Sequence, residues 1–371
     1  QLNIWYNRMN EYYIADYIWL DKEGIPRSKS KTIFNIKSED KKITNLLDKN
    51  KYDEWSYDGS STGQLTGEGN TEIIIKPVAV FIDPFRELKY PNINVLVLCD
   101  TYNSDGSPTE SNNRYKAMDI FNNFGHTIPW YGIEQEFFIM SNDDINISSK
   151  TCLPYKQNFE LNNPTKLSSN LQGQYYCSSG SNNAFGRNIV DEAYNLSLKA
   201  GVKCSGMNAE VAPSQWEIQV GPCEGIEAGD HLVILRYILN RVGEKYNVQI
   251  NLDPKPLCKE FNGSGCHVNF STTTMRNKNG IIDIMSSIKK LGEKHKEHME
   301  VYGKDNDKRM SGKKETSDFN TFTWGIATRN TSIRIPMNTN KEGKGYFEDR
   351  RPSSNMDPYI VTSKILETIN T

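Results

Sequence analysis

Acidic side chains inside segments that otherwise resemble buried strands are the clearest chemical signal in the sequence. In residues 130–140, WYGIEQEFFIM, strand alternation places Trp130, Glu134 and Glu136 on one face. The apolar residues Ile133, Phe137 and Ile139 lie on the other face. The two carboxylates are then about 6–7 Å apart at Cα, close enough to serve one metal cluster. Ionised carboxylates this close are unfavourable unless a cation compensates them. The alternative for such a pair is an exposed strand edge.

Three further segments repeat this pattern of polar groups on a strand. They are residues 208–222, 262–271 and 346–352, which carry Glu210, Glu217, His267, Asn269, Ser271 and Glu348. Each has a simpler interpretation, because a single core histidine is usually hydrogen-bonded and a Gly-Ser-Gly loop is usually a turn. Five carboxylates with one imidazole, spread over four strand-like segments, together favour Mg²⁺ or Mn²⁺ over zinc.

Arginines accompany these acids. Arg329 and Arg334 lie in residues 324–336, a stretch that we expect to be half-buried, and Arg309, Arg350 and Arg351 lie in flanking segments. Arginine binds phosphate and carboxylate oxygens in a bidentate manner, although any single arginine is as often part of a structural ion pair. Divalent metals together with converging arginines are typical of phosphoryl transfer.

The elements that must position these residues divide the chain into a strand-rich N-terminal part and a mixed remainder. Short β-branched and aromatic stretches predict strands over residues 12–20, 31–36, 71–80 and 94–102. Helical spacing predicts helices over residues 114–124, 188–200, 224–247 and 280–302 and a last helix from about 357. The His295 and His298 pair falls on a Lys/Glu-rich face that we expect to be solvated, and residues 141–174 read as an extended polar excursion. We therefore predict an α+β fold with two domains.

Composition excludes several classes of protein. Lys plus Arg number 44 and Asp plus Glu 46 among 371 residues, a balance that argues against a nucleic-acid-binding surface. No apolar run approaches the roughly 20 residues of a membrane span. Seven cysteines without a CxxC pair, and a polar first stretch without a signal-peptide pattern, predict reduced thiols in a cytoplasm.

At this point the chain resembles the glutamine synthetases of the eukaryotic type (type II), from residue 15 to the final helix. The motifs that carry the resemblance are YDGSSTGQ at 57–64, KP at 76–77, DPF at 83–85, GIEQE at 132–136, NAEV at 208–211, QWE at 215–217, NGSGCH at 262–267, SIRIP at 332–336 and YFEDRRPSS at 346–354. Their order matches the family throughout.

The resemblance implies a β-grasp N-terminal domain, residues 1–107, and a catalytic domain, residues 108–371, with a curved antiparallel sheet flanked by helices. It implies that glutamate, ATP and ammonia give glutamine, ADP and phosphate through a γ-glutamyl phosphate. It also implies two or three Mg²⁺ or Mn²⁺ ions per site.

The resemblance assigns roles to matching positions. One metal, nearer glutamate, would be held by Glu136, Glu210 and Glu217, and another, at the ATP phosphates, by Glu134, His267 and Glu348. Glutamate would be contacted by Asn262, Gly263, Arg309 and Arg350. The transferring phosphoryl group would face Arg329 and Arg334, and the nucleotide would lie beside Trp130, Asn269, Ser271 and Tyr346.

Two acids complete the implied mechanism. Asp58 matches the family residue that binds ammonium and accepts its proton, and Glu315 matches the acid of a flap that closes over the intermediate. In the family the Asp58 loop completes the active site of an adjacent subunit, which implies a homo-oligomer, a decamer of two stacked pentamers. The chain departs from the family at Lys314, at 260–261 (EF) and at 330–331 (NT). Two alternatives remain: an inactive structural or sensing protein with this fold, and a ligase for an organic amine.

Overall fold

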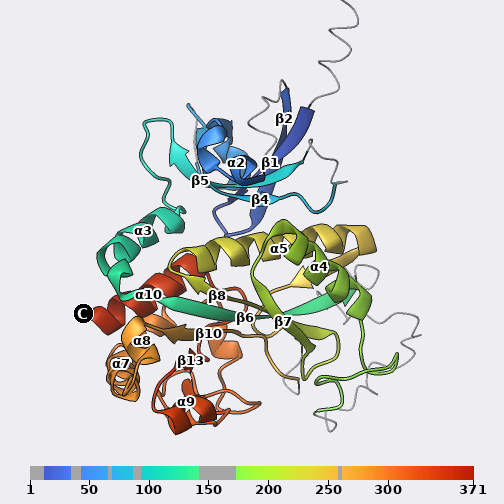
Figure 1. The fold of residues 1–371 in the computed structure, drawn as a ribbon. Helices are drawn as coiled ribbons and strands as arrows, with labels where there is room; N and C mark the ends of the chain where they lie inside the picture. Colours follow the sequence, from blue (N-terminus) through green and yellow to red (C-terminus); the bar gives the residue numbers. More distant parts are fainter. Residues whose placement is uncertain (1–11, 35–42, 66–68, 87–92, 142–172, 258–260) are drawn as a thin grey trace, which may run out of the picture. The chain divides into compact units, whose positions relative to one another are not determined.

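A computed structural model describes residues 12–34, 43–65, 69–86, 93–141, 173–257 and 261–371 (Figure 1). The fold class predicted from the sequence is confirmed, because a strand-rich N-terminal part precedes a large sheet flanked by helices. The chain divides into two compact units. The first comprises residues 1–116, 195–202 and 233–237, and the second comprises the rest. The domain boundary at residue 107 stays a prediction.

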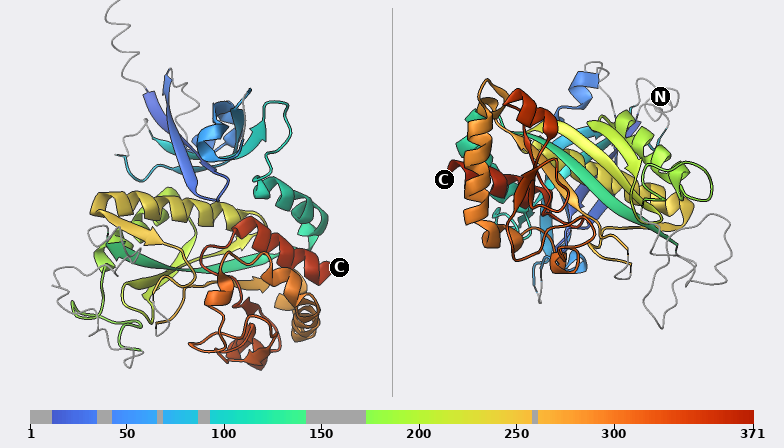
Figure 2. Two further views of the ribbon diagram at one scale, coloured as in Figure 1. Left: turned by 180° about the vertical axis from the view of Figure 1, so that it is seen from behind. Right: turned by 90° about the horizontal axis from the view of Figure 1, so that it is seen from below.

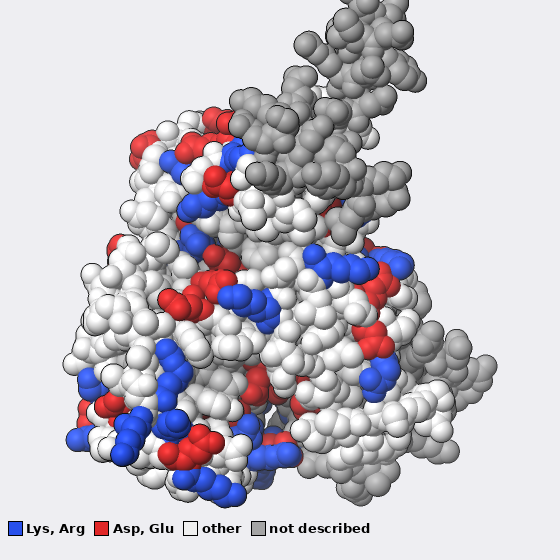
Figure 3. Space-filling model, viewed as in Figure 1, with Lys and Arg blue, Asp and Glu red and all other residues white. Residues whose placement is uncertain are grey.

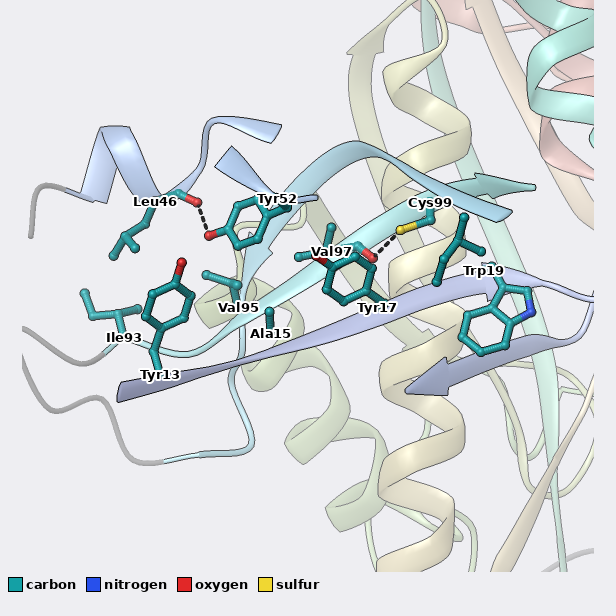
Figure 4. Close-up of a cluster of buried hydrophobic side chains, with 11 residues drawn as sticks. Tyr13, Ala15, Tyr17, Trp19, Leu46, Tyr52, Ile93, Val95, Val97 and Cys99 are labelled. Atoms are coloured by element: carbon teal, nitrogen blue, oxygen red, sulfur yellow. Dashed lines mark hydrogen bonds between the residues drawn. The ribbon is translucent and has the colours of Figure 1, made fainter. Parts of the chain in front are cut away.

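The first unit contains a five-stranded sheet in the order β2-β1-β5-β4-β3. Its strands are β1 (Tyr12–Leu20), β2 (Pro26–Phe34), β3 (Trp55–Asp58), β4 (Glu72–Ile82) and β5 (Val95–Asn103). Only the central β1–β5 pair is parallel. Alternate β1 residues, from Tyr13 to Trp19, face Val95 and Val97 of β5 in an apolar cluster (Figure 4). The strand predicted over 31–36 begins earlier, at Pro26, because its exposed Lys/Ser residues pair along the whole length of β1.

The second unit is built on an eight-stranded sheet in the order β11-β12-β13-β10-β6-β8-β7, with β9 also paired to β6. Its strands are β6 (Trp130–Ser141), β7 (Cys204–Ala209), β8 (Gln215–Glu224), β9 (Val248–Asn251), β10 (Cys266–Ser271), β11 (Trp324–Ile326), β12 (Ile333–Ile335) and β13 (Phe347–Asp349). Every neighbouring pair is antiparallel except β11–β12. The long β6 therefore lies between β8, which carries Glu217, and β10, which carries His267, while Glu348 lies on β13 and Glu210 directly follows β7.

Helices cover this sheet, and α5 runs along one of its faces (Figures 1 and 2). The main helices are α3 (Asn113–Phe124), α4 (Arg187–Ala200), α5 (Glu227–Tyr246), α7 (Ile281–Glu293), α8 (His295–Met299) and α10 (Pro358–Asn370). Two predicted ends are confirmed. Gly201 follows α4 with φ +91°, and the Asp357 carboxylate accepts hydrogen bonds from the first backbone N–H groups of α10.

The prediction of one helix over residues 280–302 was wrong in two respects. The helix breaks at Lys294 into α7 and α8, and its two histidines are buried rather than solvated, with His298 0% exposed. His298 lies 2.5 Å from the Tyr302 hydroxyl and 2.8 Å from that of Thr368 on α10, so this face packs against another helix. The excursion expected over residues 141–174 lies almost wholly outside the described residues.

The surface agrees with the charge balance of the sequence. Basic and acidic side chains are interspersed on the face that Figure 3 shows. Among the described residues, none of the helices combines the length and apolar content needed to cross a bilayer.

Candidate metal and nucleotide site

The register of the sheet brings the predicted carboxylates together in two clusters. Glu134 of β6 lies opposite His267 of β10, and Glu136, two residues further along β6, lies opposite Glu217 of β8. Because side chains alternate along a strand, both β6 acids project from the same face. The sequence alone predicted that Glu134 and Glu136 share a face of β6. The pairing of β6 with β10 and β8 places His267 and Glu217 beside them.

The first cluster consists of Glu136, Glu210 and Glu217, whose closest oxygens lie within 4.8 Å of one another. Glu210 follows the end of β7 and is held by the Asn208 amide at 2.9 Å. Glu136 accepts hydrogen bonds from the Gly265 N–H at 2.7 Å and the Gln215 amide at 3.1 Å. All the donors named here are neutral, so they orient the carboxylates without cancelling their charge.

Burial makes the charged form of this first cluster unfavourable. The pKa of Glu136, Glu210 and Glu217 is raised to about 8 each. Desolvation by burial is the larger cause, and repulsion between the acids is the smaller one. A divalent cation reverses both causes, because it replaces lost hydration and attracts the carboxylates. Three oxygen ligands with raised pKa values around one point therefore fit a hard cation such as Mg²⁺ or Mn²⁺.

The second cluster consists of Glu134, His267 and Glu348, also within 4.8 Å of one another. His267 Nδ1 lies 3.3 Å from a Glu134 oxygen and 3.4 Å from a Glu348 oxygen. Burial, and then the charge of Arg350, lower the pKa of His267 well below its usual range, which keeps the imidazole in the neutral form that binds metals. Glu348 is also paired with Arg334 and, at 2.7 Å, with Arg350.

A third group that could be mistaken for a metal site was not predicted from the sequence. Cys223, Glu227 and His231 lie within 4.8 Å of one another at the start of α5. His231 Nδ1 accepts a hydrogen bond from the Lys203 N–H at 3.1 Å, so a neutral ring carries its proton on Nε2, 3.3 Å from Glu227. A metal needs that Nε2 lone pair, and the Lys203 ammonium already neutralises Glu227 at 2.7 Å. The group fits a structural ion-pair network better than a metal site.

The four residues predicted to lie beside the nucleotide line one pocket of about 450 Å³. Its wall includes Trp130, Asn269, Ser271 and Tyr346. Asn269 also donates to Glu134 at 2.8 Å, which connects the pocket to the second carboxylate cluster. Arg276, which the sequence analysis missed, lies 4.0 Å above the Trp130 ring and donates to the Ser271 hydroxyl at 3.0 Å. No motif marked this arginine, because the ring that it covers, Trp130, lies on a strand far from it in the sequence.

The glycine loop before β10 is packed against Arg309. A Cβ on Gly263 would lie 2.4 Å from the Pro254 carbonyl oxygen and 2.5 Å from Arg309 Cγ, so only glycine fits there. The buried Arg309 guanidinium donates to the Arg351 carbonyl at 2.7 Å and to Asn306 at 3.0 Å. The neighbouring Asn262 is also buried. These contacts keep the loop directly beside Glu136, which accepts from its Gly265 N–H.

The remaining arginines and Glu315 lie around the second cluster. Arg329 was expected in a half-buried stretch, but its side chain is 51% exposed in the loop between β11 and β12, where the chain turns at Ala327 with φ +53°. Arg329 lies 3.3 Å from the Glu315 carboxylate, and Arg350 donates to the Glu315 carbonyl at 3.4 Å. The structure thus brings Glu315, Arg329, Arg334 and Arg350 close to Glu348.

Asp58 belongs to the first unit and ends strand β3. Its exposed carboxylate accepts hydrogen bonds from the Ser60 hydroxyl at 2.8 Å and the Ser61 hydroxyl at 2.7 Å. Hydrogen bonds from Ser61, Ser60 and Thr71 lower the pKa of Asp58 to about 2. The group is a permanent anion at neutral pH.

Phosphoryl transfer requires cations and arginines that neutralise the moving charge, close to a pocket for the donor. This sheet provides both ligand clusters, three arginines at Glu348 or its neighbours, and the Trp130 pocket. The arrangement fits the class of enzymes that carry out metal-dependent phosphoryl transfer.

Comparison with known proteins makes the family specific. The family model described as "Glutamine synthetase, catalytic domain" matches residues 112–298. A glutamine synthetase nodule isozyme of Vigna aconitifolia is 46% identical over 99% of this chain and 96% of its own length. Root isozyme 5 of Zea mays is 45% identical over 96% of this chain and 93% of its own. Cytosolic isozyme 1-3 of Arabidopsis thaliana is 46% identical over 96% and 94%. The chain belongs to the glutamine synthetase family, of the eukaryotic type, as its motifs predicted.

Proposed function

We propose that this chain is a glutamate–ammonia ligase that uses ATP to make glutamine through a γ-glutamyl phosphate. The observation that carries the proposal is the convergence of Glu134, His267 and Glu348 beside Glu136, Glu210 and Glu217 on one sheet. Relatives named glutamine synthetase, about 45% identical along nearly the whole chain, support the same activity. The inactive and organic-amine alternatives have no observation in their favour.

Activation of glutamate explains the need for this site. A carboxylate is a poor acyl donor at neutral pH, and transfer of the ATP γ-phosphoryl group gives it a good leaving group. Divalent cations, when bound, would neutralise phosphate charge and polarise the phosphoryl group to be transferred. Glu136, Glu210 and Glu217 would hold one ion near glutamate, and Glu134, His267 and Glu348 would hold another at the phosphates. We propose Mg²⁺ or Mn²⁺, two or three ions per site.

The arginines and the pocket orient the two substrates. We propose that Arg329 and Arg334 face the transferring phosphoryl group, where guanidinium forks stabilise charge on its oxygens. Asn262, Gly263, Arg309 and Arg350 would contact glutamate. The base of ATP would occupy the pocket of Trp130, Asn269, Ser271 and Tyr346, since that pocket opens beside Glu134.

Ammonia enters as ammonium, which cannot attack until it loses a proton. We propose that Asp58 binds the cation and receives its proton, and that Glu315 closes over the intermediate and excludes water. The low pKa of Asp58 supports the first role more strongly than the second, because a permanent anion attracts a cation but is a weak base.

We propose further that the chain forms a homo-oligomer, a decamer, in which Asp58 of one subunit serves the site of the next, and that it works in the cytoplasm. The support is the family resemblance, together with relatives named cytosolic isozymes. Mass determination tests the decamer. Mixing inactive Asp58→Asn and Glu136→Ala chains tests the shared site, because mixed oligomers regain activity only if the two residues act in different chains of one site.

The direct test measures ADP and glutamine formed from glutamate, ammonium, ATP and Mg²⁺. We expect activity from the parent chain and a loss in Glu136→Ala beyond the about 10–100-fold typical of residues that only support a ligand. The matched control is Glu244→Ala, which alters an exposed acid paired with Arg241 on α5. A well-folded oligomer that forms no glutamine rejects the proposal, and comparison of ammonium with organic amines tests the amine specificity.

A further inference from the structure

The side chain of Gln64 joins both ends of the turn that carries Asp58. Its Oε1 accepts hydrogen bonds from the Tyr57 hydroxyl and, at 2.8 Å, from the Thr62 hydroxyl. Tyr57 immediately precedes Asp58, and Thr62 is the last residue of the 3₁₀ turn η3 (Gly59–Thr62) that Asp58 caps. One amide oxygen therefore fixes the chain on either side of the carboxylate.

The other end of the same amide is anchored in a distant segment. The Nε2 atom of Gln64 donates a hydrogen bond to the Ser111 hydroxyl at 3.0 Å. Within the turn itself, the backbone N–H of Gln64 donates to the Gly59 carbonyl at 3.1 Å. Tyr57 is also stacked on Trp19 of β1, with ring centroids 4.3 Å apart. The Asp58 turn is thereby tied to β1 and to the segment that follows β5, within one unit.

Asp58 needs such support because it has little of its own. It is exposed, and two of its three hydrogen-bond donors, Ser60 and Ser61, belong to the same short turn, so they move with it; the third, Thr71, lies just before β4. The turn itself has one buried residue, Gly59, which packs beside Ile73 of β4 and donates its N–H to the Thr71 carbonyl at 2.7 Å. Rigid placement of the carboxylate must come from residues that connect the turn to the sheet.

We infer that Gln64 is a positioning residue for Asp58, and that through it Gln64 sets the affinity of the enzyme for ammonium. The inference rests on the proposed function of Asp58. Gln64 touches no substrate in this scheme. Its contribution is to hold the carboxylate in one place, since a displacement of about 1 Å from the productive position can cost a hundredfold in rate.

Ammonium and hydroxylamine together distinguish positioning from general damage. Hydroxylamine is a weaker base than ammonia and is largely neutral at pH 7, so it needs neither an anion to bind it nor a base to deprotonate it. A variant in which Asp58 is no longer held in position should therefore form less glutamine from ammonium. It should form γ-glutamyl hydroxamate from hydroxylamine at nearly the parent's rate. General damage to the site should impair both.

The experiment uses the full-length oligomer and the variant Gln64→Met, which keeps the side-chain length and removes the amide hydrogen bonds. We expect the KM for ammonium to rise about tenfold or more, with the KM for ATP and glutamate and the hydroxylamine reaction little changed. Gln64→Glu, which keeps an oxygen for Tyr57 and Thr62, should restore part of the affinity. Gln249→Met, at an exposed position of β9, is the matched control and should behave like the parent.

Each outcome decides the question. If Asp58→Asn leaves the ammonium reaction unchanged, the proposed role of Asp58 fails and the inference fails with it. If Asp58→Asn loses that reaction while Gln64→Met keeps a normal ammonium KM, the inference alone fails. Equal losses with both amines in Gln64→Met also overturn it. Should Gln64→Met not fold, Ser111→Ala removes the 3.0 Å anchor of the amide while leaving Gln64 in place, and must still raise the ammonium KM selectively.

Discussion

Replacement of Glu217 by glutamine should stabilise the metal-free protein and remove the part of its stabilisation by metal that comes from the first cluster. Desolvation and the neighbouring acids raise the pKa of Glu136, Glu210 and Glu217 from 4.5 to about 8 each. At 1.36 kcal/mol per pH unit, ionising one such carboxyl in the folded state costs up to about 5 kcal/mol. The three costs do not add, because removing one charge relieves the other two.

The sign of the pH dependence follows from these pKa values. Between about pH 4.5 and 8 the folded metal-free protein binds more protons at this cluster than the unfolded chain does, so its stability falls as the pH rises through that window. Glu217→Gln removes one acid and part of its neighbours' repulsion. We expect the variant to gain about 1–3 kcal/mol over the parent at pH 8.5 in EDTA, and little at pH 5.

Metal should stabilise the parent more than the variant. In the parent, Mn²⁺ at a hundredfold excess over the dissociation constant of the first cluster should add about 2.7 kcal/mol from that cluster, and this share should be lost in Glu217→Gln. Thermal unfolding with EDTA or Mn²⁺ measures both effects, at about 2–4 °C per kcal/mol for a domain of this size. Glu244→Gln, on the surface, is the control. A variant that is less stable than the parent in EDTA at pH 8.5, or that gains as much stability from Mn²⁺ as the parent does, refutes the reasoning.

Three other substitutions test other parts of the site. Trp130→Ala should raise the KM for ATP about tenfold, because it removes one wall of the pocket, and leave turnover at saturating ATP nearly unchanged; steady-state kinetics checks both. Gly263→Ala should raise the KM for glutamate, since its Cβ would lie 2.5 Å from Arg309 Cγ; an unaltered KM would contradict the assignment. Arg351→Met leaves the fully buried Asp349 without its ion-pair partner at 2.6 Å and should cost about 3–5 kcal/mol in urea unfolding, less if Asp349 is replaced as well.

The local pattern of β6 could be predicted from the sequence because strand alternation is a short-range property. Glu134 and Glu136 were placed on one face with Trp130, and the structure puts Trp130 in the pocket and both acids in the clusters. The register could not be obtained this way. Pairing of Glu136 with Glu217 depends on β6 and β8 being neighbours, which is decided by packing of segments about 80 residues apart.

Helix faces were predicted less well, because charge along a helix was taken as a sign of solvent. Both histidines are buried: His298 lies 2.8 Å from the Thr368 hydroxyl of α10, and His295 lies 3.0 Å from the Phe319 carbonyl in the segment before β11. Those partners lie 70 and 24 residues away. Arg276 was missed for the same reason, since nothing near it in the sequence shows that it will cover Trp130.

The two carboxylate clusters are compensated differently by the protein, and this difference bears on the function. Glu348 is paired directly with Arg334 and Arg350. Glu136 accepts its hydrogen bonds from the neutral Gly265 and Gln215, and the charges of Arg309 and Arg350 lower its pKa without offsetting the effect of burial. The cluster of Glu136 is therefore unstable when ionised and empty, a cost to folding that only a cation removes. Because the same uncompensated charge attracts a cation, the feature that destabilises the metal-free protein is the one that would bind metal at the proposed glutamate site.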